Sequence, residues 1–294
     1  MKPTFAIGDH DVWRIEEWGG KFAAPAELFA EYEEEAFSAQ AERFTPDYLR
    51  DGELYAFLQS WLIDVDGTKV LIDTGAGNGK DRPHIPVFGN LKTDFLERFE
   101  QTGTSPQNVD IVINTHLHID HVGWNTSWDN GQWRPTFPNA RYIFPRIEKD
   151  VWDPEGDQFG SMNGRFVNAN VFEDSVQPIL ESGRAELVED GHEVLPGVRM
   201  LTAPGHTPGH MLVEVQSGND MALFTGDILH HPMQIIRPDW NSVFCEDPMQ
   251  AAETRRKVIE RAARTGARLV PAHFGGSHSV FVSLTSDGFQ PVKG

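Results

Sequence analysis

The sequence has 294 residues, of which 25 are basic and 44 acidic, and its formal net charge is −19. Surfaces that bind nucleic acid or an anionic membrane require clustered Lys and Arg, so this charge balance argues against both kinds of partner. The chain contains one cysteine, Cys245, which excludes an intramolecular disulfide, and no stretch approaches the roughly 18 uncharged apolar residues of a membrane span. We therefore predict a globular protein of the cytoplasm that is not bound to a membrane.

Residues 1–54 differ from the rest of the chain by an acidic, Ala-rich stretch between Pro25 and Phe44. The apolar residues of this stretch recur with the spacing of one helical face, so we predict an amphipathic helix there. Three successive glutamates at residues 33–35 leave a solvated acidic arm as the alternative. We assign residues 1–54 to an N-terminal extension that packs either on its own domain or on a second subunit.

Residues 55–294 consist of short β-rich runs that are separated by turn residues and interrupted by helices. The turn Asp66-Gly67 predicts a hairpin. The helix before the last predicted strand is the best delimited, with Asp247 as N-cap, Pro248 at its first position and Gly266 as its stop. Without a linker long enough to separate domains, this pattern predicts one layered α/β domain. The predicted elements are strands at residues 57–65, 69–73, 111–114, 141–144, 211–215, 221–225 and 268–271, and helices at residues 91–101 and 248–265.

The most informative segment is residues 114–123, N-T-H-L-H-I-D-H-V-G, which directly follows a predicted buried strand. It places His116, His118, Asp120 and His121 in an H-x-H-x-D-H spacing, which would arise by chance with a probability on the order of one in a thousand. Imidazole and carboxylate groups are the ligands that Zn²⁺ and related ions prefer, and four of them in one short loop could serve two metal ions. Burying these groups without a cation would be costly.

Three later segments offer further ligands. His206 lies in the turn G-H-T-P-G-H, where glycine and proline allow the backbone to bend tightly, and Asp227 and His273 each end a predicted strand. On sequence alone, His210 and His273 could each be a ligand or a structural residue. Together with the H-x-H-x-D-H loop, these segments predict a metal site.

Taken in order, from L-I-D-T-G at residues 71–75 to His273, these motifs resemble those of metallo-β-lactamase-fold hydrolases. The resemblance implies a four-layer αββα sandwich, in which residues 55–294 form the hydrolase domain with a two-metal site at one edge. It also implies that Asp73 orients the metal loop, with a purely structural D-T-G turn as the alternative. The implied ligands are His116, His118 and His206 for the first metal, Asp120, His121 and His273 for the second, and Asp227 as the bridge.

Several branches of this family match less well. Lactam-hydrolysing members lack the bridging carboxylate, whereas Asp227 is present here and Cys245 lies outside the motifs. Members that cleave nucleic acids must hold a polyanion, which a chain of this charge does poorly. Flavin-linked di-iron members have Glu at the position of His118. Glyoxalase-II-like thioesterases carry late basic residues for glutathione, and this sequence shows no clear match to them.

The sequence best resembles the group of quorum-quenching lactonases and methyl-parathion-hydrolase-like esterases. His230, three residues after Asp227, fits the esterase side of this group, because many acyl-homoserine lactonases have Tyr there. The resemblance implies that a metal-bridging hydroxide attacks a neutral lactone or aryl ester. Asp120 would pass a proton to the leaving group, and His230 would either donate a hydrogen bond to the carbonyl oxygen or serve a structural role.

Three alternatives stay open at this point: a phosphotriesterase of the methyl-parathion type, a glyoxalase-II-like thioesterase, and a metal-binding sensor without turnover. Two divalent metal ions are expected as cofactors. Zn²⁺ is the default for a site rich in His, and Fe, Mn and Co are the other candidates. In the resembling group N-terminal arms often support a homodimer, so residues 1–54 are also a predicted dimer contact.

Overall fold

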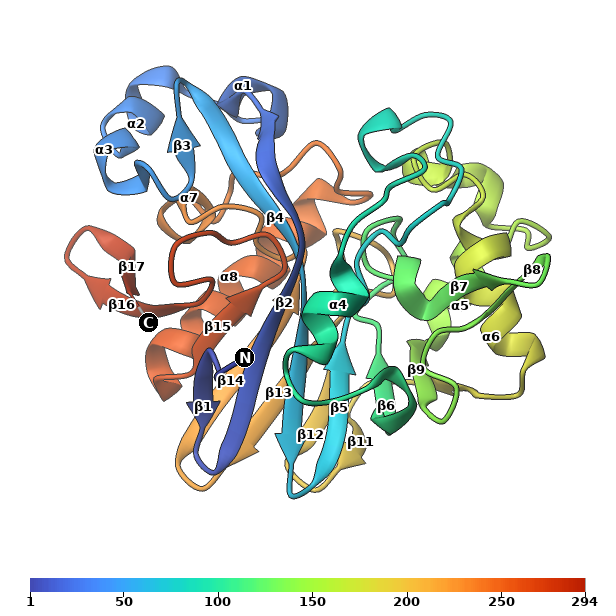
Figure 1. The fold of residues 1–294 in the computed structure, drawn as a ribbon. Coiled ribbons are helices and arrows are strands. Elements are labelled where there is room, and N and C mark those ends of the chain that lie inside the picture. The colour runs from blue at the N-terminus through green and yellow to red at the C-terminus, as the bar shows by residue number, and fades with distance from the viewer. Residues whose placement is uncertain (294) are drawn as a thin grey trace. The chain divides into compact units, whose positions relative to one another are not determined.

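A computed structural model describes residues 1–293 of the chain, and its contacts divide into two compact units. The first unit consists of Met1–Trp18 and Leu58–His192, and the second of Gly19–Phe57 and the chain from Glu193 onward. Two long strands, β2 (His10–Ala23) and β4 (Glu53–Val65), continue from one unit into the other (Figure 1).

The sheet of the first unit has the strand order β1-β2-β4-β5-β6-β9-β10 (Figure 1). Its antiparallel part includes the β4–β5 hairpin, which turns at Asp66 and Gly67 as predicted, and β5, β6, β9 and β10 pair in parallel. The remaining strands of the unit are β1 (Phe5–Ile7), β5 (Thr68–Ile72), β6 (Ile111–Ile113), β9 (Arg141–Pro145), β10 (Ala185–Val188) and a separate hairpin of β7 (Thr126–Asp129) and β8 (Gln132–Pro135).

Three helices of the first unit share a hydrophobic core with its sheet: α4 (Phe95–Glu100), α5 (Arg146–Trp152) and α6 (Gln177–Glu181). The first of them begins later than residue 91, where we predicted its start. The reason is that the carbonyls of Leu91 and Thr93 accept hydrogen bonds from Gly79 N and Asn78 Nδ2, which fixes this backbone in a loop. Short helical turns lie at Pro86–Phe88, Pro106–Asn108, Gly123–Asn125, Phe159–Ser161, Asn163–Arg165 and Phe172–Val176.

The sheet of the second unit follows the chain order from β11 to β17, and β14 and β15 are its parallel pair. Helix α8 (Pro248–Thr265) packs on this sheet and confirms the predicted helix. The Asp247 side chain accepts a hydrogen bond from Gln250 N at 3.0 Å, and Gly266 ends the helix with a left-handed φ of 72°. The strands are β11 (His192–Leu195), β12 (Val198–Thr202), β13 (Met211–Ser217), β14 (Asp220–Gly226), β15 (Arg268–Pro271), β16 (Val280–Thr285) and β17 (Gly288–Lys293).

The predicted long amphipathic helix between Pro25 and Phe44 is wrong. The chain instead forms α1 (Pro25–Leu28), α2 (Glu34–Ser38) and α3 (Ala41–Phe44), followed by the short strand β3 (Leu49–Arg50). The helix breaks because Ala30 N donates to Asn241 O at 3.0 Å and Phe29 forms a β-bridge with Ser242. The apolar residues are nevertheless buried, in a cluster with Met233 and Trp240. The extension assigned to residues 1–54 stays a prediction.

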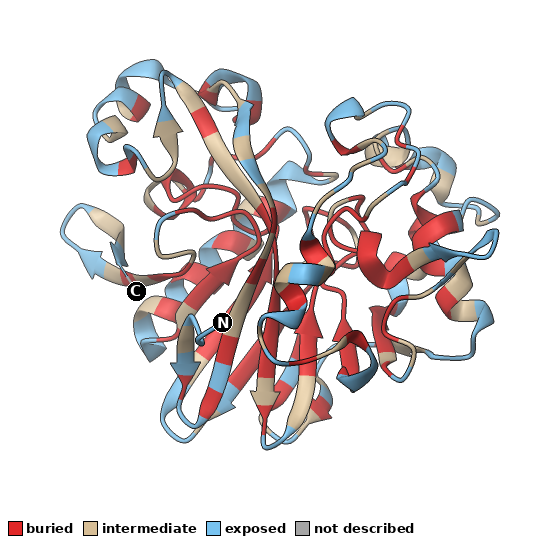
Figure 2. Ribbon diagram, viewed as in Figure 1, coloured by how far each residue is buried: buried red, intermediate tan, exposed pale blue. Residues whose placement is uncertain are grey.

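Burial is as high in certain loops as in the strands that they follow (Figure 2). Most residues at 73–77 after β5, at 114–125 after β6 and at 227–232 after β14 are buried. Loops normally run over the surface, because a buried backbone needs a partner for every N–H and C=O group. Their burial therefore marks these three loops as candidates for functional residues. Across residues 1–293, no helix combines the length and the hydropathy that crossing a membrane requires.

Candidate metal centre

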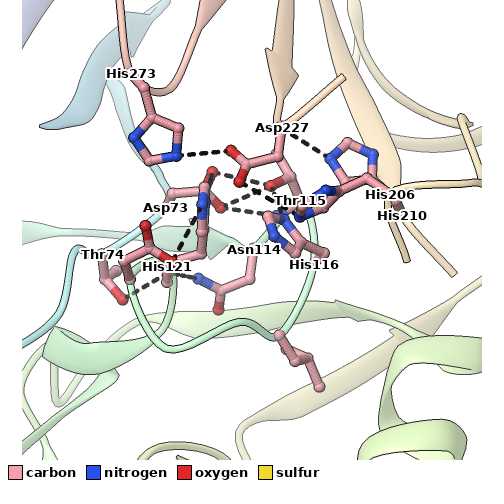
Figure 3. A network of polar contacts seen from close by, with 12 residues as sticks. Asp73, Thr74, Asn114, Thr115, His116, His121, His206, His210, Asp227 and His273 are labelled. Atoms are coloured by element: carbon pink, nitrogen blue, oxygen red, sulfur yellow. Dashed lines mark hydrogen bonds and ion pairs between the residues drawn. The ribbon is translucent and has the colours of Figure 1, made fainter. Parts of the chain in front are cut away.

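Asp73 organises the predicted metal loop of the first unit. It follows β5 with a left-handed φ of 53°, and its backbone N donates to Ile113 O at 2.8 Å. Its carboxylate accepts three hydrogen bonds, from Thr115 N at 2.8 Å, Thr115 Oγ1 at 2.9 Å and His121 Nδ1 at 2.9 Å (Figure 3). One carboxylate thus holds two separate points of the loop.

The same contacts set the tautomers of two histidines. A carboxylate only accepts, so His121 Nδ1 carries the proton and His121 Nε2 keeps its lone pair. Thr115 has one hydroxyl hydrogen, which it donates to Asp73. Its Oγ1 therefore accepts from His116 Nδ1 at 3.0 Å, and in the neutral ring His116 Nε2 also keeps its lone pair. Orientation of metal-binding imidazoles by an outer carboxylate is a general feature of metal sites. The geometry supports the predicted orienting role of Asp73.

The loops after β5 and β6 interlock through their backbones. Thr74 N donates to His121 O at 2.8 Å, and Gly123 N donates to Gly75 O at 2.7 Å. A Cβ atom at Gly123 would collide with the backbone of Ala76, so only glycine permits this approach. Asn114 Nδ2 adds a hydrogen bond to His121 O at 2.7 Å. The position of His121 is therefore fixed from both loops.

Leu117, between two of the predicted ligands, is held by residues that sequence analysis missed. Its N donates to the buried carboxylate of Glu148 at 3.0 Å, and its carbonyl accepts from Asn168 Nδ2 at 2.8 Å. The same Glu148 oxygen accepts from Trp152 Nε1 at 2.9 Å, and the Trp152 ring contacts His118 at 5.1 Å between ring centroids. These residues belong to no motif and lie far along the chain, so the sequence offers no signal for them.

Glu17 on β2 is a second unpredicted support of the first unit. Its buried carboxylate accepts from Ala76 N at 2.6 Å, Gly77 N at 3.0 Å and Trp124 Nε1 at 2.7 Å. Burial raises the pKa of Glu17 to about 7, although these hydrogen bonds act to lower it. A side chain at Gly75 would collide with this carboxylate. Glu17 thus ties β2 to both interlocked loops.

In the second unit, the parallel strands β14 and β15 bring Asp227 and His273 together at their carboxyl ends. His273 Nδ1 lies 2.9 Å from Phe57 O, which can only accept, so Nδ1 carries a proton. His273 Nε2 lies 3.0 Å from Asp227 Oδ1 (Figure 3). A proton or a metal cation between these two atoms would be attracted by both. The pair can therefore contribute to a cation site.

Two further histidines surround the same carboxylate. His206 Nε2 lies 3.4 Å and His230 Nε2 3.3 Å from Asp227 Oδ2. Ligand atoms of Asp227, His230 and His273 all lie within 4.8 Å of one another. Burial lowers the pKa of His230, and the nearby Asp227 only partly offsets this effect. The carboxylate of Asp227 therefore stands among three imidazoles within one unit.

The G-H-T-P-G-H turn holds Asp227 as well as offering His206. Ala203 N donates to His210 O at 2.8 Å, which closes the turn. Gly205 has a φ of 126° and lies so close to Ala251 of α8 that a Cβ atom would collide with it. His210 Nε2 accepts from Asp227 N at 3.2 Å (Figure 3). His210 therefore positions the Asp227 backbone, which supports the structural alternative for this histidine.

Each unit contains one cluster of predicted site residues. The rings of His116 and His118 are 4.7 Å apart between centroids, those of His116 and His121 are 4.0 Å apart, and His121 Nε2 lies 3.8 Å from Asp120 Oδ1. These four residues form the first cluster. The second cluster consists of His206, Asp227, His230 and His273. Both clusters offer imidazole and carboxylate donors, the set that suits Zn²⁺ and related ions.

Curated relatives of this chain include N-acyl homoserine lactonases from Bacillus sp and from Bacillus cereus. Each is 28% identical, over 192 and 185 residues respectively. The matches cover 61% and 57% of this chain and 65% and 62% of the two relatives, so the chain spans less than two thirds of the length of either.

Solved structures resemble this chain over nearly its whole length. The hydrolase AbOPH of the beta lactamase superfamily is 22% identical with a TM-score of 0.82, and the match covers 98% of this chain and 95% of that chain. AidC, described as a dizinc quorum-quenching lactonase, is 20% identical with a TM-score of 0.79, over 99% of this chain and 96% of that chain. These likenesses confirm the predicted metallo-β-lactamase fold.

The family model of the metallo-beta-lactamase superfamily matches residues 58–273. The match begins within β4 and ends at His273, so it contains both clusters of site residues. Because the match covers well over half of the chain, this protein belongs to the metallo-beta-lactamase superfamily.

Proposed function

We propose that this protein is a metal-dependent hydrolase that cleaves a lactone or an aryl ester. The observation that carries the proposal is the approach of three imidazoles to one buried carboxylate: the Nε2 atoms of His206, His230 and His273 lie 3.0 to 3.4 Å from the carboxylate oxygens of Asp227. Membership of the superfamily and the relatives named N-acyl homoserine lactonase support an ester-cleaving reaction. Among the proposed substrates, these relatives favour a lactone.

The proposed ligands divide between two metal ions, with Asp227 bridging both. His116, His118 and His206 would bind the first ion, and Asp120, His121 and His273 the second. Zn²⁺ fits this donor set, and Fe, Mn and Co are the alternatives. When bound, two such ions supply Lewis acidity at the carbonyl oxygen and lower the pKa of water toward neutrality.

The chain's own residues would then orient the substrate and transfer a proton to the leaving group. Asp120 is the proposed proton carrier: it would take the proton that the attacking water loses and pass it to the departing alkoxide, because it is the more exposed carboxylate of the two clusters. His230 would donate a hydrogen bond to the carbonyl oxygen as negative charge develops there. Its lowered pKa keeps the ring neutral at pH 7, with one N–H available to donate.

A neutral substrate suits the charge of the chain. The formal net charge of −19 would repel polyanions, whereas uncharged lactones and esters approach without such a penalty. We therefore propose a small, neutral lactone or ester as substrate. Residence in the cytoplasm and assembly as a homodimer stay predictions, and sizing at several protein concentrations tests the dimer.

The test combines metal content with hydrolysis of a substrate panel. The panel contains γ- and δ-lactones, an acyl-homoserine lactone, an aryl ester, a phosphotriester and a β-lactam. We expect about two metal ions per chain, as in two-metal hydrolases, and turnover of lactones or esters. Asp227→Ala should lose both metal and turnover, while Asp220→Ala, at the exposed opposite end of β14, should keep both. Metal-free wild-type protein, or full activity of Asp227→Ala, would refute the proposal.

A further inference from the structure

His231 is a buried histidine that the proposed mechanism does not use. It follows His230 directly, and only 2% of its surface is exposed. Four aromatic rings surround it at centroid distances of 4.6 to 5.9 Å. We call these four residues the aromatic box: Phe29, Phe37, Phe44 and Tyr48.

The hydrogen bonds of His231 define its protonation state. Its Nδ1 accepts from Met233 N at 3.0 Å, so the neutral ring carries its proton on Nε2. Within residues 1–293, no polar group accepts a hydrogen bond from this Nε2. The rings of Phe44 and Tyr48 cross the imidazole at 80° and 73°, and an aromatic face can accept an N–H weakly. The box therefore suits a neutral imidazole and opposes a charged one, in keeping with a pKa lowered to about 3 by burial.

The backbone of residues 230–234 is held by hydrogen bonds to the His231 ring and to one amide side chain. Gln234 Oε1 accepts from His230 N at 2.7 Å, and Gln234 Nε2 donates to Trp240 O at 3.0 Å. Met233 N is held by the His231 ring, as described above. With its N–H fixed and the next side chain buried, His230 has little freedom to change direction.

The aromatic box comes from the N-terminal segment, which is itself fixed to the loop after α7 (Met233–Ile236). Val243 N donates to Leu28 O at 2.9 Å, and the carboxylate of Glu31 accepts from Asn241 N at 2.6 Å and from Asn241 Nδ2 at 3.0 Å. The segment that supplies the box is thus attached to the loop that follows His231. Movement of residues 29–48 would carry His231 with it.

We propose that His231 is a positioning residue, through which the aromatic box fixes His230 in its place beside Asp227. The proposal rests on the proposed function, because it assumes that His230 contacts the substrate. Substitution of His231 should therefore lower kcat through His230 and leave the metal ligands in place.

The experiment is a double-mutant cycle between His230 and His231, measured on the best substrate of the panel. His231→Phe keeps an aromatic ring but removes the acceptor for Met233 N. We expect kcat to fall about tenfold, because misplacement of a catalytic group by a fraction of an ångström has effects of this order. KM and metal content should stay within about twofold of the wild type. In the His230→Ala background, the same substitution should have no further effect on kcat.

Two controls separate positioning from loss of stability. His231→Asn retains an acceptor near the Nδ1 position and should recover part of the kcat that His231→Phe loses. His192→Phe replaces a histidine outside both clusters and the aromatic box, whose Nε2 lies 3.3 Å from Glu186 Oε1, and should leave kcat unchanged. If His231→Phe does not fold, Phe37→Leu loosens the box more mildly and should lower kcat in the same direction.

Additive effects of the two substitutions, or a loss of kcat that simply follows the melting temperature across the variants, would overturn the proposal. Wild-type turnover by His230→Ala would overturn it too, because His230 would then have no role to support. That last result leaves the metal-dependent hydrolase itself intact, since Asp227→Ala and metal content test it separately.

Discussion

The two clusters of site residues are held in place by different chemistry. In the first unit, the buried carboxylates of Glu17, Asp73 and Glu148 accept hydrogen bonds from the backbone and from side chains of the metal loop. In the second unit, the groups that hold Asp227 and His230 are a histidine, His210, an amide and aromatic rings. One cluster is therefore held by buried carboxyl groups, and the other by neutral groups and packing.

A buried cation supports the backbone around the second cluster. Arg255 of α8 is fully buried, and it donates to the carbonyls of Ile228, Pro238 and Trp240 at 2.7 to 2.9 Å. In the first unit, carboxylates collect backbone N–H groups, whereas here a guanidinium collects backbone C=O groups. The two units should therefore respond differently to pH and to substitution.

The largest effect is expected at Asp73. Asp73→Ala leaves Thr115 N and His121 Nδ1 without their acceptor in a buried site, so the free energy of unfolding should fall by about 3 to 5 kcal/mol. Metal affinity should fall by roughly 10- to 100-fold, because the tautomers of two proposed ligands are no longer fixed. Asp73→Asn keeps the size and tolerates the positive φ, so it should be intermediate. Denaturant unfolding measures the free energy of unfolding, and metal titration measures the affinity. Wild-type values of both for Asp73→Ala would show that buried carboxylates do not hold the first cluster.

A pH effect of the first unit is expected from Glu17. Its pKa of about 7 in the fold lies above the ordinary value of 4.5, so the folded state holds a proton that the unfolded state releases. The wild type should lose stability relative to Glu17→Gln as pH rises from 4.5 to 7, by at most about 1.4 kcal/mol per pH unit. Unfolding both proteins across this range measures the difference. If the difference in unfolding free energy between the two proteins does not change with pH, the hydrogen bonds to Glu17 outweigh burial in setting its pKa.

The second unit should show the opposite sign through His231. Its pKa of about 3 lies below the ordinary 6.5, so only the unfolded state takes up a proton between these values. Relative to His231→Phe, the wild type should lose stability as pH falls from 6.5, amounting to about 2 kcal/mol by pH 5. Loss of stability toward high pH instead would remove the contrast between the units.

The smallest effect is expected at the start of α8, where Asp247 caps the helix. Asp247→Ala removes the side chain that accepts from Gln250 N, which should cost about 1 kcal/mol of unfolding free energy. Asp247→Ser retains a capping oxygen and should restore most of it. The backbone of Asp247, whose N donates to Gly205 O at 2.9 Å beside His206, is the same in both variants. We therefore expect kcat to stay unchanged, and a lower kcat would show that the start of α8 influences the position of His206.

The parts of the structure that sequence could predict are those encoded by neighbouring residues. The H-x-H-x-D-H loop brings four groups together within six positions, and Asp247, Pro248 and Gly266 mark both ends of α8. The strands that were predicted, β4, β5, β6, β9, β13, β14 and β15, have largely apolar runs, whereas more polar strands such as β2 and β17 were missed. How the ligands share the metal ions stays a prediction.

Other features depend on contacts between distant residues and carried no signal. Glu17, Glu148 and Asn168 each contact the metal loops from elsewhere in the chain, without a motif. The long N-terminal helix was predicted from its apolar spacing, but pairing of Phe29 and Ala30 with residues 241–242 prevents it. Local propensity is a weak guide where tertiary hydrogen bonds compete for the same backbone groups.

The residues of the aromatic box lie near the N-terminus, which has a consequence for truncated variants of the chain. The family match begins at residue 58, after all four rings that enclose His231 and after Glu17. A protein trimmed to the matching residues would keep every proposed ligand, yet it would expose His231 and free the loops that follow β5 and β6. Such a fragment should be poorly soluble and inactive, so the region that defines the family is smaller than the region that can fold and work.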